Sequence, residues 1–402
     1  MNEINRQGTP QRWGVLVSTF LAYFYDSFAL LILSISMPVL LGKLGITLAQ
    51  GGLLTSASMI GAAAGSIIFG VVAENKGRKF TLILSLVWFG TGTVASLLFH
   101  TWGQWMVLRF VTCIGVGGVW GPAVALIARH WSKKYAARAS SFMLSTFAAS
   151  AIFAAMLGRL VLEVDWRILY IVAGSSIIAA VISYAVIPSD KSTTECSEKV
   201  RKSIGVKVIF EGKLAKITIL ATLLNVANMG GYWGFGSWAP SYLTEVHGLS
   251  LAKMSNFTIV MYVGMFIGYQ AWSLLADKIG RKKVMFLSFL FDVIAISMYL
   301  IIPNGNILFW WGAVVGFGFG GVFGVMGAYY NELFPERISA LGGGFCFNVG
   351  RLGSVIAPFT VGLIGEHYGL KAGLMITPIV FGLGLIAVAL LPETMNKEEE
   401  LG

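Results

Sequence analysis

The chain has 402 residues, of which 56% are hydrophobic and only 12% are charged, and its formal net charge is +10 at pH 7. Soluble domains carry about 25% charged residues, so this composition argues against a soluble protein and indicates one that lies in a membrane. The basic excess does not indicate nucleic-acid binding, because no basic patch alternates with exposed aromatic residues on a soluble domain.

Hydrophobic runs recur along the chain, and each is long enough to cross a bilayer core, which needs about 20 residues. The first run is too long for the core of a signal peptide, has no cleavage site of the A-x-A kind and is followed by many others, so we expect it to be retained. We expect twelve membrane spans, at residues 14–41, 50–73, 80–100, 104–128, 139–162, 166–188, 214–244, 252–276, 284–303, 307–331, 339–365 and 370–391.

The one long polar segment covers residues 189–213. It divides the chain almost equally, so we expect a six-helix bundle in residues 1–188, a central loop, and a second six-helix bundle in residues 214–402. The predicted fold class is therefore an all-α membrane protein.

Most basic residues fall in alternate connections between the spans. Lys and Arg are enriched in cytoplasmic loops, so both termini and the central loop are expected to lie in the cytoplasm, and the protein in the plasma (inner) membrane. The connections on the other side hold few basic residues: Lys43, Arg167, Lys253 and Lys371.

The two halves of the chain repeat each other. "GVVAENKGRK" at residues 70–79 aligns with "SLLADKIGRK" at residues 273–282, with an offset of 203 residues. The same offset aligns "GVGGVWG", which begins at Gly115, with "GFGGVFG", which begins at Gly318. Glycines of this kind allow helices to approach closely, and separate blocks at one offset indicate two homologous halves.

The first pair of blocks lies in short turns between spans. Gly77 and Gly280 permit a positive φ in such a turn, while the acidic residues can cap a helix and the arginines can bind carbonyl or carboxylate oxygens. A charge cluster of this kind can hold one conformation and release it in another. The alternative is that the basic residues only anchor the topology.

With this doubled motif the chain resembles the major facilitator superfamily of secondary transporters, over essentially its whole length. The resemblance implies two pseudo-symmetric six-helix bundles around a central cavity, and transport by alternating access. "YFYDSFALLILSISMP" and "NELFPERISALGGGFCFNVGRLGSVIAP" are similar to stretches of the organic-acid/proton symporters, both the aromatic-acid and the sialate/lactate groups. The second stretch is shared with the sugar porters. The stretch "LPET" at residues 391–394 also resembles the ending of the sugar porters.

The expected conformational latch combines the doubled motif with the second of these stretches. Arg129 stands at the position equivalent to Glu332, so this charge network cannot be symmetric. The expected latch residues are Glu74, Gly77, Arg78, Asp277, Gly280, Arg281, Glu332 and Arg337.

Asp26 is a single carboxylate inside a long apolar run, near the expected middle of the first span. A charge there costs about 2.5–3.5 kcal/mol on the insertion scale, so such residues usually face a cavity and have a function. We expect Asp26 to bind and release the coupling proton, and its repeat mate Asn228 to mark the same position without titrating. The alternative is a structural hydrogen bond between helices.

Arg351 is expected at mid-span, where its planar guanidinium suits a carboxylate. We expect it to bind the anionic group of the substrate, with Asn348 on the same helix face; the alternative is a fixed ion pair. Arg109 belongs to a motif that the superfamily resemblance links to proton coupling, so we expect it to tune Asp26. The remaining candidate substrate contacts are Tyr25, Tyr232, Trp233 and Gln270.

Two other charged residues fall within the spans. Asp292 is expected on a peripheral helix, where a structural pairing is favoured over coupling. Arg159 is expected near a helix end, where a long side chain can reach the interface.

The sequence does not predict an enzyme, because no nucleophile–base pair, metal cluster or phosphate loop appears. The three cysteines, Cys113, Cys196 and Cys346, fit no metal spacing, and we expect no cofactor. The expected partners are a small organic anion, protons and the lipid bilayer, and we expect a monomer.

The sequence therefore favours proton-coupled import of a small organic anion, with a monocarboxylate as the expected substrate. A sugar or polyol symporter is the alternative, because of the sugar-porter ending. Efflux is disfavoured, because the fifth span lacks the G-P-x-x-G-G motif of drug/proton antiporters. A sensor is disfavoured because no sizeable soluble domain exists to pass on a signal.

Overall fold

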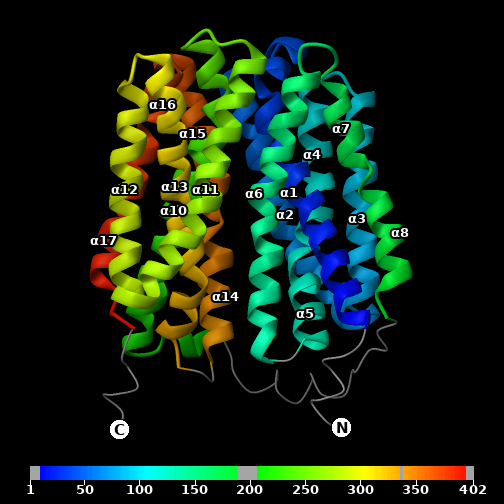
Figure 1. Ribbon diagram of the computed structural model, residues 1–402, viewed down its shortest axis with the longest axis vertical. Helices are drawn as coiled ribbons and strands as arrows, with labels where there is room; N and C mark the ends of the chain where they lie inside the picture. The colour runs from blue at the N-terminus through cyan, green and yellow to red at the C-terminus, as the bar shows by residue number, and fades with distance from the viewer. Residues whose placement is uncertain (1–9, 132, 189–205, 336–337, 395–402) are drawn as a thin grey trace. The chain divides into compact units, whose positions relative to one another are not determined.

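The computed structural model describes residues 10–131, 133–188, 206–335 and 338–394, and every regular element in these ranges is helical (Figure 1). In the first half, the elements are α1 (Pro10–Leu44), α2 (Leu48–Lys76), α3 (Arg78–Ala95), the 3-10 helix η2 (Ser96–Leu98), α4 (Trp102–Gly117), α5 (Trp120–His130), α6 (Lys133–Val161), α7 (Arg167–Gly174) and α8 (Ser176–Val186).

The second half begins with the 3-10 helix η3 and continues with eight α-helices. They are η3 (Val206–Phe210), α10 (Lys213–Glu245), α11 (Leu251–Ile279), α12 (Arg281–Ile301), α13 (Gly305–Leu333), α14 (Ser339–Gly350), α15 (Leu352–Tyr368), α16 (Leu370–Leu374) and α17 (Ile376–Leu390).

These helices form 12 segments that are long and apolar enough to cross a membrane. The predicted all-α class and the predicted number of spans are confirmed. Each of four spans consists of two consecutive α-helices, and a fifth consists of α3 followed by the 3-10 helix η2; the hydrophobic runs do not reveal these breaks. The breaks at Ser175, Arg351 and Met375 have helical φ and ψ, so the span keeps its direction. The glycine-rich stretch "NMGGYWGFGSWAP" at residues 228–240 lies in the uninterrupted helix α10.

The chain divides into two compact units, one of Met1–Ile46 and Leu53–Glu198, the other of Thr47–Gly52 and Lys199–Gly402. Most of the expected central loop, residues 189–205, lies outside the described residues. Its last part forms η3 and the first residue of α10.

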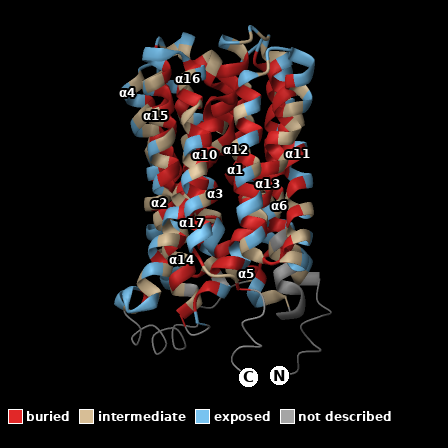
Figure 2. Ribbon diagram, turned by 90° about the vertical axis from the view of Figure 1, so that its left-hand side faces the viewer, coloured by how far each residue is buried: buried red, intermediate tan, exposed pale blue. Residues whose placement is uncertain are grey.

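Within each unit the helices bury one face against their neighbours and expose the other (Figure 2). In the first unit α1 packs against α5, α6 and α8, and α3 packs against α4, α7 and α8. In the second unit α10 packs against α15 and α17, and α13 packs against α11 and α12. The exposed faces are largely apolar, with Ile67, Val181 and Leu274 among the most exposed side chains, as expected of surfaces that face lipid.

Glycines bring the same pairs of helices close together in both units. A Cβ at Gly61 would collide with the carbonyl oxygen of Phe110, and a Cβ at Gly264 would collide with that of Ala313. These two pairs are related by the offset of 203 residues. Backbones that approach this closely leave no room for a side chain.

A second pair of glycine contacts matches in the same way. Gly118 packs against Ser85 and Phe69, whereas Gly321 packs against Ser288 and Trp272. Each contact residue in the second unit again follows its counterpart by 203 positions. The internal repeat is therefore a repeat of tertiary contacts as well as of sequence.

Single glycines join two pairs of long helices. Gly77 links α2 to α3 with a φ of 91°, and Gly280 links α11 to α12 with a φ of 103°. This backbone region is disfavoured for residues that carry a Cβ, so the positive φ predicted for the paired motif is present in both units.

Candidate functional site

Asp26 lies near the middle of α1 and is 7% exposed. It belongs to the first unit, and its charge acts on the thiol of Cys113 in α4. The carboxylate that stood alone in the sequence therefore lies beside α4 within the first unit. A carboxylate in a membrane helix is costly unless polar neighbours compensate it.

Arg109 of α4 supplies a charge of the opposite sign. Its side chain is fully buried, and its Nε donates a hydrogen bond of 3.0 Å to the hydroxyl of Ser58. Its two terminal nitrogens donate to the carbonyl oxygen of Ala29 at 3.3 and 3.2 Å. Ala29 lies three residues after Asp26 on α1, so Arg109 holds its charge within about one helical turn of the carboxylate.

Cys113 completes this cluster. It is fully buried, interacts electrostatically with both Arg109 and Asp26, and shares a hydrogen bond with Ser58. Sequence analysis did not select Ser58 or Cys113 as site residues. The spacing of Arg109 and Cys113 could have predicted that Cys113 lies beside Arg109, because residues four apart lie on one helix face. No comparable pattern in the sequence identifies Ser58.

Tyr25, next to Asp26, is half-buried, and its hydroxyl lies 2.9 Å from that of Ser175. Ser175 is the residue at which α7 gives way to α8. The Tyr25 hydroxyl is thus engaged inside the first unit, where it ties α1 to the break in the sixth span.

Asn228 and Tyr232 occupy one face of α10 in the second unit, four residues apart. Asn228 is 1% exposed, and its Nδ2 has no hydrogen-bond partner among the described residues. Tyr232 is buried, and its ring stands nearly perpendicular to that of Trp233, with centroids 5.4 Å apart. An amide with a free donor next to buried aromatic rings can contact a polar ligand.

Arg351 stands at the junction between α14 and α15. It is half-buried, and its guanidinium lies 5.4 Å from the ring centroid of Phe347. Asn348, one turn earlier, is exposed and donates from Nδ2 to the carbonyl oxygen of Gly344 at 2.9 Å. Arg351 and Asn348 are three positions apart, a spacing that places residues on one helix face. Gln270 is exposed on α11.

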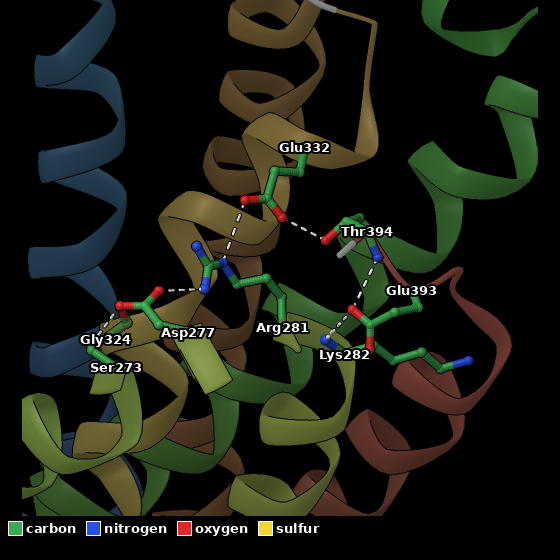
Figure 3. A network of polar contacts seen from close by, with 8 residues as sticks. All are labelled: Ser273, Asp277, Arg281, Lys282, Gly324, Glu332, Glu393 and Thr394. Atoms are coloured by element: carbon green, nitrogen blue, oxygen red, sulfur yellow. Dashed lines mark hydrogen bonds and ion pairs between the residues drawn. The ribbon is translucent and has the colours of Figure 1, made fainter. Parts of the chain in front are cut away.

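A network of charges lies at the α11–α12 turn in the second unit (Figure 3). Arg281 contacts Asp277 at 2.6 Å and Glu332 at 3.4 Å. Thr394 donates from its hydroxyl to Glu332 at 2.5 Å, and its main-chain N–H donates to Glu393 at 3.0 Å. The stretch "LPET" thus joins the network of the paired motif, which the sequence did not reveal.

The first unit has a different arrangement at the equivalent turn. Arg78 donates to the main-chain carbonyl of Ala125 at 3.2 Å, and Glu74 is exposed. This arrangement differs from the double carboxylate pairing of Arg281. Arg337, the last of the expected latch residues, lies outside the described residues.

Asp292 corrects one expectation. We expected its carboxylate to have a structural partner, but it is fully buried on α12 and neither oxygen accepts a hydrogen bond from any described residue. It packs instead against Gly318 of α13, where a Cβ would collide with Oδ1. Its counterpart in the first half is Phe89. Arg159 is exposed.

No group of three potential metal ligands occurs in the parts of the chain that the structure describes, and Cys113 and Cys346 are free. Outside the spans, burial lowers the pKa of His247, and the charge of Lys371 lowers it further. The His247 ring stacks edge-on against Tyr242, with centroids 5.0 Å apart.

Comparison with known proteins agrees with the fold and with the repeat. The model of the Major Facilitator Superfamily matches residues 19–270 and 221–401. The D-xylose–proton symporter has a similar fold, with a TM-score of 0.79 at 16% identity over 96% of this chain and 99% of that one.

Three relatives in sequence are transport proteins. The chain is 27% identical to the cis,cis-muconate transport protein of Acinetobacter baylyi over 99% of its length and 98% of that protein. It is 26% identical to a sialic acid transporter of Escherichia coli, with 95% and 94% covered. It is 28% identical to an inner membrane metabolite transport protein of Escherichia coli, with 83% and 82% covered.

The two matches of the family model together cover residues 19–401, and the described residues hold 12 segments that are long and apolar enough to cross a membrane. The chain belongs to the Major Facilitator Superfamily, and is a multi-pass membrane protein that transports a small molecule and is not an enzyme.

Proposed function

We propose that this protein imports a small organic anion, a monocarboxylate, together with a proton. The observation that carries the proposal is the cluster of Asp26, Arg109 and Ser58 in the first unit, which holds a titratable carboxylate inside a membrane helix. A group that takes up a proton when it faces one side and releases it on the other couples proton flow to transport. The relatives named for muconate and sialic acid, both carboxylic acids, support an anionic substrate.

In this mechanism Asp26 carries the proton and Arg109 sets the range in which it titrates. Arg351 binds the carboxylate of the substrate, because its planar guanidinium can donate two parallel hydrogen bonds. Asn348, Asn228, Tyr232, Trp233, Tyr25 and Gln270 complete the proposed substrate contacts. One proton with one monoanion moves no net charge, so the pH gradient alone drives accumulation.

The proposal also covers the orientation of the protein in the membrane and the conformational latch. Most basic residues fall in alternate connections between the spans, on the side that we expect to hold both termini, and this supports a cytoplasmic location for both termini. The relative described as an inner membrane protein supports that membrane. Alternating access is proposed to break and remake the contacts of Arg281 with Asp277 and Glu332 in each cycle.

A sugar or polyol symporter is the second candidate. Asn228 has an amide donor without a partner among the described residues, next to the buried ring of Tyr232, and amides beside aromatic rings suit hydroxylated substrates. In that case Arg351 would not contact the substrate, so Arg351→Ala would leave substrate affinity unchanged.

The test uses purified protein in liposomes. Monocarboxylates, dicarboxylates and sugars are offered with and without an imposed pH gradient, which we expect to drive accumulation of a monocarboxylate only. Asp26→Asn should abolish uphill uptake but keep exchange, because the substrate site is intact while the proton site is lost. Arg159→Gln, which removes an exposed charge, is the matched control.

Two outcomes contradict the proposal. If a protonophore leaves accumulation unchanged, transport is not coupled to protons. If Asp26→Asn accumulates substrate as the unmodified protein does, Asp26 does not carry the coupling proton.

A further inference from the structure

A pocket with a volume of about 420 Å³ opens at one end of the second unit. It lies where α10 and α12 begin and α17 ends (Figure 1). Three lysines and a set of apolar residues form its walls. The lining residues are Lys213, Lys216, Ile217, Leu220, Lys282, Ala389, Leu390, Leu391 and Pro392.

The charged part of the lining is entirely basic. Lys213 and Lys216 are exposed one turn apart at the start of α10. Lys282 is half-buried, and its Nζ donates to the carbonyl oxygen of Ala389 at 2.9 Å. The nearby carboxylate of Glu393 accepts from the main-chain N–H of Lys282 at 3.2 Å, while the Lys282 side chain extends away from it (Figure 3). The three ammonium groups therefore share the pocket without a carboxylate in its lining.

The internal repeat distinguishes Lys282, which has an equivalent in the first unit, from Lys213 and Lys216, which have none. The counterpart of Lys282 is Lys79, whose Nζ bonds the carbonyl oxygen of Ile187 and lies 5.1 Å from the ring centroid of Tyr184. In each unit one lysine thus joins the start of the third span to the end of the sixth span: α3 to the end of α8 in the first unit, and α12 to the end of α17 in the second. At the counterparts of Lys213 and Lys216, taken with the spacing that relates Asp26 to Asn228, the first half has Gln11 and Gly14. The two additional lysines are particular to the second unit and need another explanation.

The apolar part of the pocket continues into the surface that faces lipid. Leu390 is 54% exposed at the end of α17, and Ile219 is 53% exposed on α10. Lysines at the ends of membrane helices reach toward the interface with their ammonium groups. The pocket thus offers positive charge at headgroup depth and apolar surface directly beneath it.

We propose that this pocket binds the phosphate of an anionic phospholipid from the leaflet at this end, which is the cytoplasmic one in the orientation proposed above. Lys213, Lys216 and Lys282 contact the phosphate, and the acyl chains lie along α10 and α17. Basic pockets between membrane helices are suited to such headgroups. Binding would tie the first helix of the second unit to its third and last helices.

The test is native mass spectrometry of the purified full-length protein with phosphatidylglycerol, and phosphatidylcholine as the zwitterionic reference. Each lysine near an anionic headgroup contributes about fivefold to affinity, so Lys213→Gln with Lys216→Gln should weaken phosphatidylglycerol binding roughly thirtyfold. Lys278→Gln with Lys283→Gln removes two exposed lysines at the same end that do not line the pocket, and should change binding less than about twofold.

A further variant and a competition experiment complete the test. Lys213→Arg with Lys216→Arg should retain binding, because arginine keeps the positive charge at both positions; the glutamine variant should unfold at the same temperature as the unmodified protein, which separates lost binding from lost folding. Glycerol phosphate and inorganic phosphate should not displace the lipid at equal concentration, because they lack its acyl chains. The proposal is overturned if both glutamine pairs weaken binding equally, if phosphatidylcholine binds as well, or if the soluble phosphates compete on equal terms.

Discussion

Arg109 donates from both terminal nitrogens of its guanidinium to the main-chain carbonyl oxygen of Ala29, at 3.3 and 3.2 Å. A carbonyl inside a helix already accepts one hydrogen bond, and its second lone pair is available to a neighbour. This contact fixes the orientation of α4 against α1 and places a permanent positive charge about one turn from Asp26. The proton site and the packing of the first unit therefore depend on the same side chain.

Arg109→Lys is expected to destabilise the protein, because lysine cannot reach Ser58 and Ala29 at once. Losing hydrogen bonds from a buried charged group costs about 1.5–3 kcal/mol, which should appear as a lower unfolding temperature in detergent and as slower proton-coupled uptake. Arg159→Lys, at an exposed position, should change neither. Unchanged stability and uptake in Arg109→Lys would show that the guanidinium fork has no special role.

Asp292→Asn is expected to preserve uphill transport. The side chain is fully buried against Gly318, and neither carboxylate oxygen has a hydrogen-bond partner among the described residues, so an uncharged isostere fits the same space. Uptake driven by an imposed pH gradient measures this, with Asp26→Asn as the comparison. If Asp292→Asn also abolishes accumulation, the second unit holds a proton site of its own.

Gly320→Ala is expected to destabilise the second unit. A Cβ at this position would meet the carbonyl oxygen of Met265 and the main-chain nitrogen of Tyr269, and overpacking of this kind costs about 1–3 kcal/mol. Gly327→Ala on the same helix is the control, since nothing lies within 4 Å of its Cβ. Thermal unfolding of the two variants should differ, and equal unfolding temperatures would contradict the close contact of α11 with α13.

Arg281→Gln is expected to alter transport more than stability. Its contacts with Asp277 and Glu332 are partly exposed, and such ion pairs contribute about 1 kcal/mol or less. If they hold one conformation of the cycle, their loss should change the uptake rate severalfold while the unfolding temperature stays within a few degrees. Lys283→Gln, a neighbouring exposed charge, serves as the control. An unchanged rate would leave Arg281 as a topology anchor.

His247 is expected to make stability depend on pH. Its pKa is lowered in the folded state, first by burial and then by Lys371, so the unfolded chain binds a proton more readily. Stability is then complete above the ordinary pKa of about 6.5 and falls as the pH drops through that value toward the folded-state pKa. The unfolding temperature should decline between pH 7 and about pH 5, and less so in His247→Gln. If the unfolding temperature of His247→Gln declines by the same amount, other titratable groups cause the decline.

Much of the scaffold could be predicted without coordinates. Apolar runs of membrane length predict the twelve spans, because a lipid-exposed backbone must satisfy its hydrogen bonds within one helix. The offset of 203 residues predicts the paired contacts of Gly61 and Gly264, since equal spacing of small residues produces equal helix approaches. Asp26 stands out because an acid in a membrane helix is costly unless it has a use.

Other features depend on which helix faces meet in space. Ser58 and Cys113 join Asp26 and Arg109 only because α4 packs beside α1 and Arg109 of α4 also reaches Ser58 of α2, and no local pattern in the sequence marks these contacts. An acid such as Asp292 could form an ion pair, but in the structure its carboxylate packs against Gly318, which has no side chain. The sequence by itself determined the spans, the repeat and the acid, since these follow from local hydropathy and spacing. Only the tertiary structure decided the partners of each polar group, since a hydrogen bond depends on positions that distant segments occupy together.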